Sequence, residues 1–408
     1  MSQPAPLPLK NLSVEEARAR MLADAALLGV ETAPLAQALG RTLAQAVDAD
    51  RDQPPFAASA MDGWAIRRED LTTDASFRIA GESAAGRAYP GVVGPGETVR
   101  IFTGAPLPAG ADMMIIQEEA TRDGDTVRFS AGENPRSNIR PAGGDFRSSD
   151  RLLEAGVRLD PWRLSLAAAA GQANLTVARR PRVAILATGD ELVQPGGAPA
   201  PDQIYESGSI ALAALVETWG GSATRLTAAA DDAAAIAEAL AGVEADLIVT
   251  IGGASVGDHD LVKPAMARLG LSLRVETIAV RPGKPTWFGT LDGGRRVLGL
   301  PGNPASALVC AELFLRPLLA ALTGRDPALV LTAARLAAPL PPAGPREHWM
   351  RAALSIDPEG RAIATAFPDQ DSSLVGVFSR ADALIRRPIN GGAALAGDIV
   401  EVLSLGRG

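Results

Sequence analysis

Three glycine-rich segments between residues 188 and 306 contain the residue types that bind phosphate groups. They are Thr188–Leu192, Gly252–Asp260 and Gly299–Ser306, and each follows a short apolar run. Glycine has no Cβ atom, so its backbone can approach a ligand closely, and free N–H groups at a helix start favour phosphate. One such segment is often an ordinary turn, whereas three at corresponding strand ends converge on one crevice. We therefore predict a shared anion-binding site.

A short basic segment, Arg281–Pro285, supplies the positive charge that this site needs. Prolines on both sides of Gly283-Lys284 stiffen the turn and direct the lysine. A positioned lysine is a point-charge partner for phosphate, and the competing interpretation is a solvated turn lysine. The segments lack the Gly-Lys-Ser/Thr ending of a Walker A loop and the Gly-x-Gly-x-x-Gly dinucleotide turn.

Carboxylates accompany the glycine-rich segments, namely Glu191, Asp231, Asp232 and Asp260. Carboxylates beside a phosphate site favour Mg²⁺, a hard cation that bridges protein and phosphate. Asp231 also begins a predicted helix, so an N-cap role is an equal alternative. Asp62 and Thr103 stand alone among small residues in the first half of the chain, and a turn-stabilising aspartate fits there as well as a catalytic one.

The composition excludes several classes of protein. Hydrophobic residues make up 47% of the 408 residues, which rules out global disorder, and a net charge of −8 argues against general nucleic-acid binding. One cysteine and two histidines exclude an internal disulfide and make a histidine-rich metal site improbable. Residues 1–10 do not resemble a signal peptide and no uninterrupted apolar run of about 20 residues occurs, so we expect a cytoplasmic protein without membrane contact.

The spacing of apolar residues, glycines and prolines changes along the chain and predicts several domains. Helices are expected at Ser13–Leu28, Pro34–Leu39 and Pro161–Ala170, around a set of short strands divided by Gly and Pro. From Arg182 apolar strands alternate with helices, which predicts a parallel sheet covered on both faces. The tail after Asp326 returns to short strands. The predicted regions are a discontinuous helical domain (1–50 and 146–180), an inserted β domain (51–145), an α/β domain (181–326) and a C-terminal β domain (327–408).

The motifs occur together in an order that resembles one family. Ser59–Trp64, Thr103–Pro106, Thr188–Leu192, Gly252–Asp260, Pro282–Pro285 and Gly299–Ser306 are similar to segments of the molybdopterin molybdenumtransferases, the MoeA / gephyrin E-domain family, over roughly residues 10 to 405. The resemblance implies a multidomain α/β and β fold. Its parts are a three-layer αβα molybdopterin-binding domain, a helical dimerisation domain, the inserted β domain and a C-terminal β-barrel-like domain.

The resemblance also implies an activity and its residues. The expected reaction inserts molybdenum from molybdate into adenylylated molybdopterin and releases AMP, with Mg²⁺ as cofactor, in a homodimer whose active sites lie between subunits. The molybdopterin adenylyltransferase is the expected protein partner. The implied catalytic residues are Asp62, Thr103, Asp145, Glu191, Asp231 and Asp260, with Asp231 and Asp260 as Mg²⁺ ligands. The predicted substrate-binding residues are Thr188, Gly189, Gly252, Gly253, Ser255, Gly257, Arg281, Lys284, Pro301, Gly302, Asn303, Pro304, Ser306 and Ser372.

The sequence departs from the family pattern at Gly144, Glu206 and Gly208, where an acid, a shorter carboxylate and an amide are usual. These departures leave a specialised paralogue open. Two alternatives differ in class. One is a molybdopterin adenylyltransferase-like enzyme, which would not need the inserted domain or the tail. The other is a non-catalytic, gephyrin-like scaffold.

Overall fold

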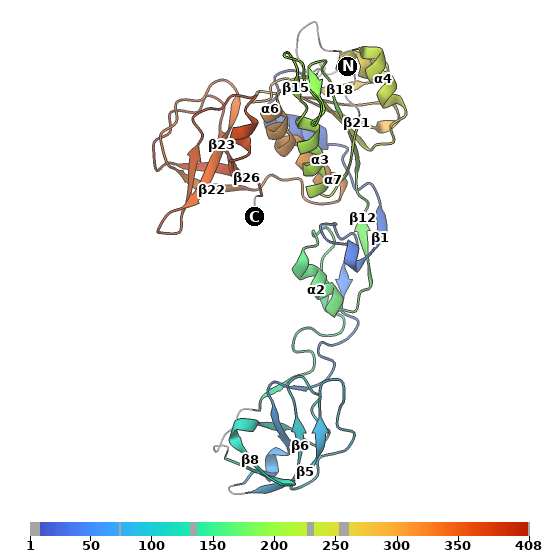
Figure 1. Cartoon of the computed structure of the whole chain (residues 1–408), viewed down its shortest axis with the longest axis vertical. Coiled ribbons are helices and arrows are strands. Elements are labelled where there is room, and N and C mark those ends of the chain that lie inside the picture. The colour runs from blue at the N-terminus through green and yellow to red at the C-terminus, as the bar shows by residue number, and fades with distance from the viewer. Residues whose placement is uncertain (1–8, 73–74, 131–136, 227–231, 253–260, 407–408) are drawn as a thin grey trace, which may run out of the picture.

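The computed structural model describes residues 9–72, 75–130, 137–226, 232–252 and 261–406. The molecule is elongated (Figure 1). An α/β region and a C-terminal barrel lie side by side at one end, a β region lies at the opposite end, and a small region joins them. The chain runs from the α/β end to the far β region and back before it builds most of the α/β region.

A six-stranded sheet forms the centre of the α/β region, in the order β16-β13-β17-β21-β20-β18. Its bounds are β13 Arg182–Ala187, β16 Ser222–Arg225, β17 Leu247–Ile251, β18 Ser272–Val275, β20 Trp287–Thr290 and β21 Arg296–Leu300. Strands β16, β13, β17 and β21 are parallel. The predicted parallel sheet is therefore correct for these four strands.

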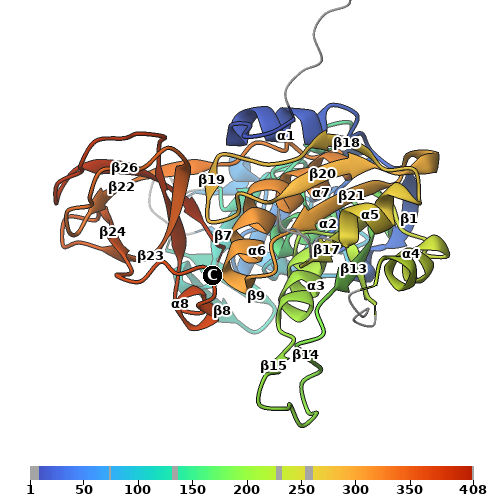
Figure 2. The same cartoon turned by 90° about the horizontal axis from the view of Figure 1, so that it is seen from above.

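Helices cover both faces of this sheet, which gives the predicted three layers (Figure 2). Successive residues of a strand point to opposite faces of a sheet, and in β13 Ile185 packs in one core while Leu186 packs in the other. Helices α3 (Gly208–Thr218), α6 (Pro304–Cys310) and α7 (Arg316–Leu322) cover the first face. Helices α4 (Ala233–Ala241) and α5 (Val262–Ala267) cover the second.

At one edge the sheet departs from the predicted parallel arrangement. Strand β20 was not predicted, and it pairs antiparallel with both β18 and β21. The turn between β20 and β21 contains Gly293 and Gly294 at φ 78° and 81°. Because two consecutive residues with positive φ allow the chain to reverse tightly, this edge forms a hairpin without a crossover helix.

Residues Pro304–Leu322 form one nearly continuous helical segment that includes a π-helical turn, Ala311–Leu315. By length and composition this segment alone among the described helices resembles a membrane span, but 89% of its most apolar window is buried inside the fold. It therefore serves as the central helix of the larger core.

Helix α1 (Val14–Leu22) has the predicted capping box, in which Ser13 and Glu16 bond reciprocally. It ends six residues earlier than predicted. Val14, Ala17 and Met21 are buried in the larger α/β core. The apolar face of this helix therefore packs against the α/β region.

The joining region contains more strand than predicted. Strand β1 (Val30–Pro34) pairs with β12 (Asn174–Ala178), and β2 (Val47–Asp48) pairs with β11 (Arg151–Leu153). The predicted helix at Pro34–Leu39 shrinks to one 3₁₀ turn, Leu35–Gln37. Helix α2 (Pro161–Ala169) begins as predicted, with Asp160 as its N-cap. The two halves of the chain that flank the inserted strands thus pair in space.

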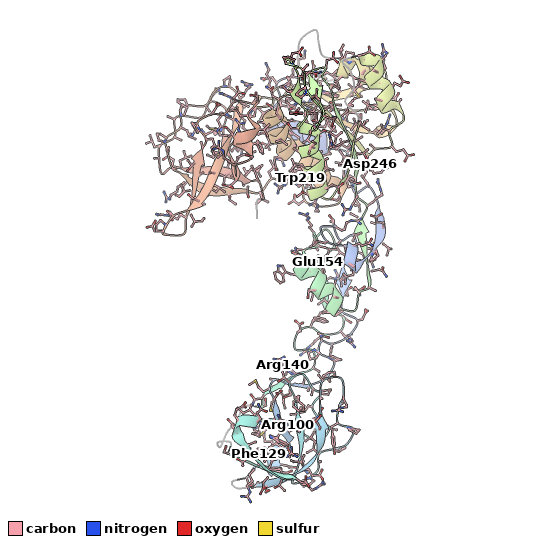
Figure 3. The ribbon with its side chains drawn as sticks, in the orientation of Figure 1. Arg100, Phe129, Arg140, Glu154, Trp219 and Asp246 are labelled. Atoms are coloured by element: carbon pink, nitrogen blue, oxygen red, sulfur yellow. The ribbon has the colours of Figure 1, made fainter. Side chains whose placement is uncertain are left out.

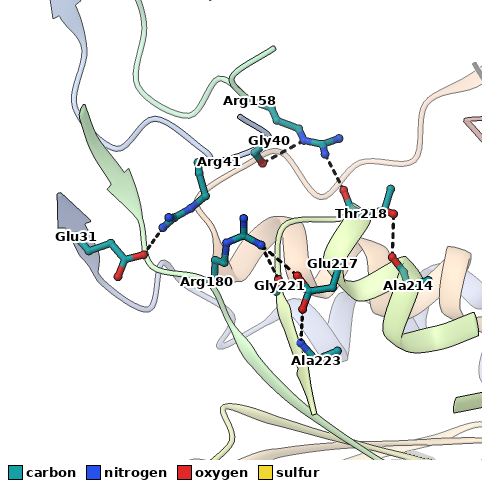
Figure 4. A network of polar contacts seen from close by, with 10 residues as sticks. All are labelled: Glu31, Gly40, Arg41, Arg158, Arg180, Ala214, Glu217, Thr218, Gly221 and Ala223. Carbon is teal, nitrogen blue, oxygen red and sulfur yellow. Dashed lines mark hydrogen bonds and ion pairs between the residues drawn. The ribbon is translucent and has the colours of Figure 1, made fainter. Parts of the chain in front are cut away.

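Polar contacts connect the joining region to the α/β region (Figure 4). The Arg158 guanidinium donates to the Thr218 carbonyl at the end of α3, 2.7 Å away, and to the Gly40 carbonyl. Arg180 donates to the carboxylate of Glu217 and to the Gly221 carbonyl, both at 3.2 Å. Guanidinium groups suit this junction because their several N–H donors satisfy helix-end and turn carbonyls together.

The far β region, hereafter the insert, is a six-stranded sheet in the order β7-β4-β6-β5-β9-β8. Its strands are β4 Gly63–Ile66, β5 Ser76–Ser83, β6 Glu97–Ile101, β7 Met113–Ile116, β8 Ala120–Asp123 and β9 Thr126–Phe129. A small pair, β3 (Ala58–Ser59) with β10 (Ile139–Arg140), lies beside it. Each face has its own apolar core.

The C-terminal region, hereafter the barrel, is closed by five strands, because β23 pairs with both β24 and β25. The strands are β22 Leu331–Leu336, β23 Glu347–Ile356, β24 Ala362–Ala366, β25 Ala383–Arg387 and β26 Ile399–Ser404, with one short helix, α8 (Val375–Phe378). A two-residue strand, β19 (Val280–Arg281), leaves the α/β region and pairs with β23. The barrel is therefore joined to the α/β region by backbone hydrogen bonds.

Candidate functional site

A cavity of about 890 Å³ opens at the carboxyl ends of β13, β17 and β21. The edge of a parallel sheet where strands end is the usual ligand position in such folds. Twelve predicted site residues line it: Thr188, Gly189, Glu191, Gly252, Arg281, Lys284, Pro301, Gly302, Asn303, Pro304, Ser306 and Ser372. The prediction that the glycine-rich segments converge is therefore confirmed for their described residues.

The glycine-rich loops pack closely on one another, and at Gly252 a side chain would not fit. Gly252 has φ 92°, and a Cβ atom there would lie 2.7 Å from the Thr188 carbonyl oxygen. A Cβ atom on Gly302 would touch the Gly252 Cα atom at 3.4 Å. The Thr188 N–H donates to the Ile251 carbonyl at 3.0 Å, which fixes the first loop against the second. Glycine at position 252 thus lets the backbone of the loops come together beside the cavity.

The basic turn is held from beneath. A Cβ atom on Gly283 would lie 2.1 Å from the Cys310 Sγ atom, so the turn packs directly on the central helix. The Thr286 hydroxyl donates to the Gly283 carbonyl at 2.8 Å, and the Ile278 N–H donates to the Lys284 carbonyl at 3.0 Å. Lys284 itself is exposed toward the cavity. Cys310 is buried, and burial raises the pKa of its thiol to about 12, which favours the protonated, unreactive form.

Glu206 is a structural carboxylate. It is buried, and its oxygens accept from the Ser209 N–H at 2.7 Å and the Ser209 hydroxyl at 2.6 Å, with Arg225 at 3.3 Å. These contacts hold the start of α3. A Cβ atom on Gly208 would lie 3.2 Å from the Ile251 side chain, which is a tight contact. Glycine at this position therefore allows the start of α3 to pack closely against Ile251. The departures at 206 and 208 therefore have a local packing explanation.

A projecting segment, residues 192–205, borders the cavity and is hereafter the flap. It contains β14 (Leu192–Val193) and β15 (Ile204–Tyr205), which pair in parallel, and it extends away from the domain (Figure 2). Tyr205 and Ile204 are half-exposed and line the cavity.

The barrel contributes four cavity residues that the sequence did not indicate, namely Arg346, Gln370, Asp371 and Ser373. They lie far along the chain from the glycine-rich loops, and no local motif marks them. Only Ser372 was predicted, through the family resemblance. Hydrogen bonds place this part of the barrel at the cavity, because the Asn303 amide donates to the Ser372 hydroxyl at 2.8 Å.

The predicted residues of the insert lie elsewhere in the chain. Asp62 accepts from the Thr103 N–H and hydroxyl, both at 2.8 Å, which holds the pKa of Asp62 below its usual range because both bonds favour the charged form. Asp145 is exposed where the chain leaves the insert. Figure 3 shows Arg100 and Arg140 of the insert at the end of the molecule opposite to Trp219 and Asp246. One chain therefore does not bring Asp62 to the cavity.

Five predicted site residues lie outside the described residues, namely Asp231, Gly253, Ser255, Gly257 and Asp260. The helix start near Asp231 is capped by its neighbour Asp232, which accepts from the Ala235 N–H at 2.8 Å. Within the described ranges no three His, Cys, Asp or Glu side chains gather as a metal site. The described residues by themselves therefore do not form a site for Mg²⁺.

His348 packs on β23 and borders a strongly basic part of the barrel. It lies on β23 opposite Arg281, and its Nε2 atom is buried without a hydrogen-bond partner in the described structure. Burial, together with the charges of Arg281 and Arg351, lowers the pKa of His348 to about 4. The imidazole is therefore neutral near pH 7 and adds no charge beside the cavity.

Three known protein regions match consecutive parts of the chain. Residues 12–171 match the MoeA N-terminal region (domain I and II), residues 184–321 match a probable molybdopterin binding domain, and residues 333–405 match the MoeA C-terminal region (domain IV). Together these matches extend over most of the chain. They include both the cavity and the insert.

Individual proteins give the same result. The chain is 33% identical to the molybdopterin molybdenumtransferase of Haemophilus influenzae, over 96% of this chain and 98% of that protein. It is 40% identical to molybdopterin molybdenumtransferase 2 of Mycobacterium tuberculosis, over 70% of this chain and 73% of that one. The crystal structure of the molybdopterin biosynthesis moeA protein from Pyrococcus horikoshii superposes with a TM-score of 0.81 at 26% identity, covering 97% and 100% of the two chains. The chain therefore belongs to the molybdopterin molybdenumtransferase (MoeA) family.

Proposed function

We propose that the cavity binds adenylylated molybdopterin together with molybdate, and that the chain transfers molybdenum to the pterin dithiolene with release of AMP. Membership of the molybdenumtransferase family makes the chain a transferase of molybdenum cofactor biosynthesis. The observation that supports the substrate is the convergence of three backbone loops and the Lys284 turn on one cavity. Its volume suits a ligand with two ring systems and a pyrophosphate.

The charges of the cavity suit two anions. Molybdate and the substrate pyrophosphate repel each other, so a site that holds both must offset this repulsion. Arg281, Lys284 and Arg346 line the cavity and provide positive charge, while the loop N–H groups provide oriented dipoles. The pterin sulfurs, and not the buried Cys310, then hold the metal. The protein contributes positioning and electrostatic stabilisation.

The position of the insert supports a site that is shared between subunits. The insert, which contains Asp62 and Thr103, lies at the end of the molecule opposite to the α/β region (Figures 1 and 3). A second copy of the chain can bring its insert to the cavity if the two elongated molecules pair around a two-fold axis. Asp62 of one subunit then acts on a substrate bound by the other.

The first expected result is that the protein is a stable homodimer. Light scattering at micromolar concentration should give twice the chain mass, and the mass should not fall on tenfold dilution. A shared site requires this state, because a monomer leaves the cavity without Asp62. A monomeric mass under these conditions would contradict the proposal.

Three further features belong to the same proposal. Mg²⁺ dependence is expected, with Asp231 and Asp260 as ligands. A transient contact with the molybdopterin adenylyltransferase would deliver the adenylylated pterin, whose phosphoanhydride is lost to water if it diffuses freely. The cytoplasm is the expected compartment.

The experiment that tests the function is a single-turnover assay with adenylylated molybdopterin, molybdate and Mg²⁺. We expect molybdenum insertion and AMP release in equal amounts. The adenylyltransferase alternative predicts instead that molybdopterin, ATP and Mg²⁺ without molybdate yield adenylylated pterin. The scaffold alternative predicts that neither mixture reacts while a partner peptide binds.

A further inference from the structure

One wall of the cavity is a barrel loop, residues 370–373, hereafter the wall loop. Two hydrogen bonds attach it to the start of α6. The Asn303 amide donates to the Ser372 hydroxyl at 2.8 Å, and the Ala305 N–H donates to the Ser372 carbonyl at 3.1 Å. The width of the cavity therefore depends on where the barrel holds this loop.

A buried arginine on β23 holds the wall loop from behind. Arg351 has no exposed surface, although it is not among the residues that line the cavity. Its N–H and its Nε atom both donate to the side-chain oxygen of Gln370, at 2.9 and 3.2 Å. Its Nη1 atom donates to the Asp371 carbonyl at 2.8 Å. One side chain thus binds two consecutive residues of the loop.

The contact is reciprocal. The Gln370 amide donates back to the Arg351 carbonyl at 3.0 Å and to the Phe367 carbonyl at 2.8 Å. The Asp371 carboxylate bonds within the loop, to the N–H and hydroxyl of Ser373 at 2.8 and 2.6 Å. The loop is therefore fixed by neutral oxygen acceptors of Gln370 and Asp371.

A buried arginine in this setting is unfavourable for stability alone. Its Nη2 atom is buried and has no hydrogen-bond partner among the described residues. A buried guanidinium held mainly by neutral oxygens loses hydration that a well-packed apolar residue would not lose. Its planar set of donors is, however, suited to fixing an amide oxygen and a carbonyl at once.

We propose that Arg351 is a positioning residue for the molybdenum transfer site. Through Gln370 and the Asp371 carbonyl it holds the wall loop against residues 303–305, and so it sets the width of the cavity around its ligand. This inference rests on the proposed function for its effect on molybdopterin binding. Its effect on the loop does not depend on the ligand.

The test compares Arg351→Lys with Arg387→Lys. Arg387 is a second buried barrel arginine, on the neighbouring strand β25, and its Nη2 atom donates to the carbonyls of Pro341 and Gly392, which do not line the cavity. Both substitutions keep a charge and lose the planar fork. Both are expected to lower the unfolding temperature.

Only Arg351→Lys should affect the wall loop. Amide hydrogen exchange at Ala305, whose N–H bonds to Ser372, is expected to become about tenfold faster in Arg351→Lys and unchanged in Arg387→Lys. Binding of molybdopterin, measured by calorimetry, is expected to weaken about tenfold in the first variant and less than twofold in the second. Equal changes in the two variants would overturn the inference, as would no change in Arg351→Lys.

Two further variants separate the possible failures. In Gln370→Ala the exchange at Ala305 should already be fast, and adding Arg351→Lys should change it little, because both act through one contact. If the two substitutions instead accelerate exchange at Ala305 additively, the inference is overturned. This comparison remains valid even if Arg351→Lys folds poorly. Lys284→Ala tests the cavity itself. Suppose that Lys284→Ala does not weaken molybdopterin binding while Arg351→Lys still accelerates exchange at Ala305. The proposed ligand site is then wrong, whereas the contact between Arg351 and the wall loop is correct.

Discussion

A chain that carries Asp62→Asn is expected to fold and to bind molybdopterin like the wild type, yet to lose molybdenum insertion at least about 100-fold. The amide keeps the size of the side chain and can still accept the two hydrogen bonds from Thr103. Only the negative charge is lost. Stopped-flow or quenched turnover of adenylylated molybdopterin measures insertion, and calorimetry measures binding.

A matched control comes from the same region. Asp70 also accepts a backbone hydrogen bond in the insert, from the Gly96 N–H at 3.1 Å, but it lies in a different turn. Asp70→Asn is expected to leave insertion within about twofold of the wild type. Equal losses in both variants would show that the insert merely tolerates such changes poorly, and would remove Asp62 from the reaction.

Mixed dimers test whether the site is shared between subunits. One chain carries Asp62→Asn and its partner carries Lys284→Ala, at a substrate concentration far below the wild-type Kd, where each homodimer is nearly inactive. If each site takes its insert from the opposite subunit, one site collects both lesions and the other is intact. The heterodimer should then regain about half of the wild-type activity. Verified heterodimers that stay inactive would show that each site lies within one chain.

The sequence predicted the α/β region well because its local patterns agree with its tertiary structure. Apolar strands such as residues 183–187 are buried on both faces, and the helices between them carry apolar residues at helical spacing. Prediction from the sequence failed where contacts between distant parts of the chain decide the structure. The apolar face of α1 predicts a helix but does not specify which core will cover it. Strand β20 is four residues long and lies between turns, so no periodicity was visible.

The same distinction applies to the site. The glycine-rich loops could be recognised because backbone approach to a ligand requires glycine at fixed places, such as Gly252. Arg346 and Gln370 could not, because ordinary polar residues of a barrel reach the cavity through tertiary contacts, namely the pairing of β19 with β23 and the bond between Asn303 and Ser372. Glu206 shows the opposite case, because as a departure from the family pattern it left a specialised paralogue open. A carboxylate beside a phosphate loop suggests chemistry, but its oxygens are occupied by Ser209.

Replacement of Lys284 by alanine is expected to weaken molybdopterin binding by about 1.5–3 kcal/mol, which corresponds to roughly 10- to 150-fold in Kd. The turn backbone should be unaffected, because its contacts with Thr286 and Ile278 involve main-chain atoms of the turn. Only the ammonium group and its stem leave the cavity. Calorimetric titration of each variant with the pterin provides the measurement.

The chain offers a natural control because it contains only three lysines. Lys10 forms an exposed ion pair with Glu276 and does not line the cavity. Lys10→Ala is therefore expected to leave Kd unchanged. Salt adds an independent criterion, because screening weakens an ionic contact. Wild-type affinity should fall with ionic strength more steeply than that of Lys284→Ala, while Lys10→Ala should follow the wild type. Parallel salt dependences in all three proteins would mean that the Lys284 charge does not contact the ligand, whatever the change in Kd.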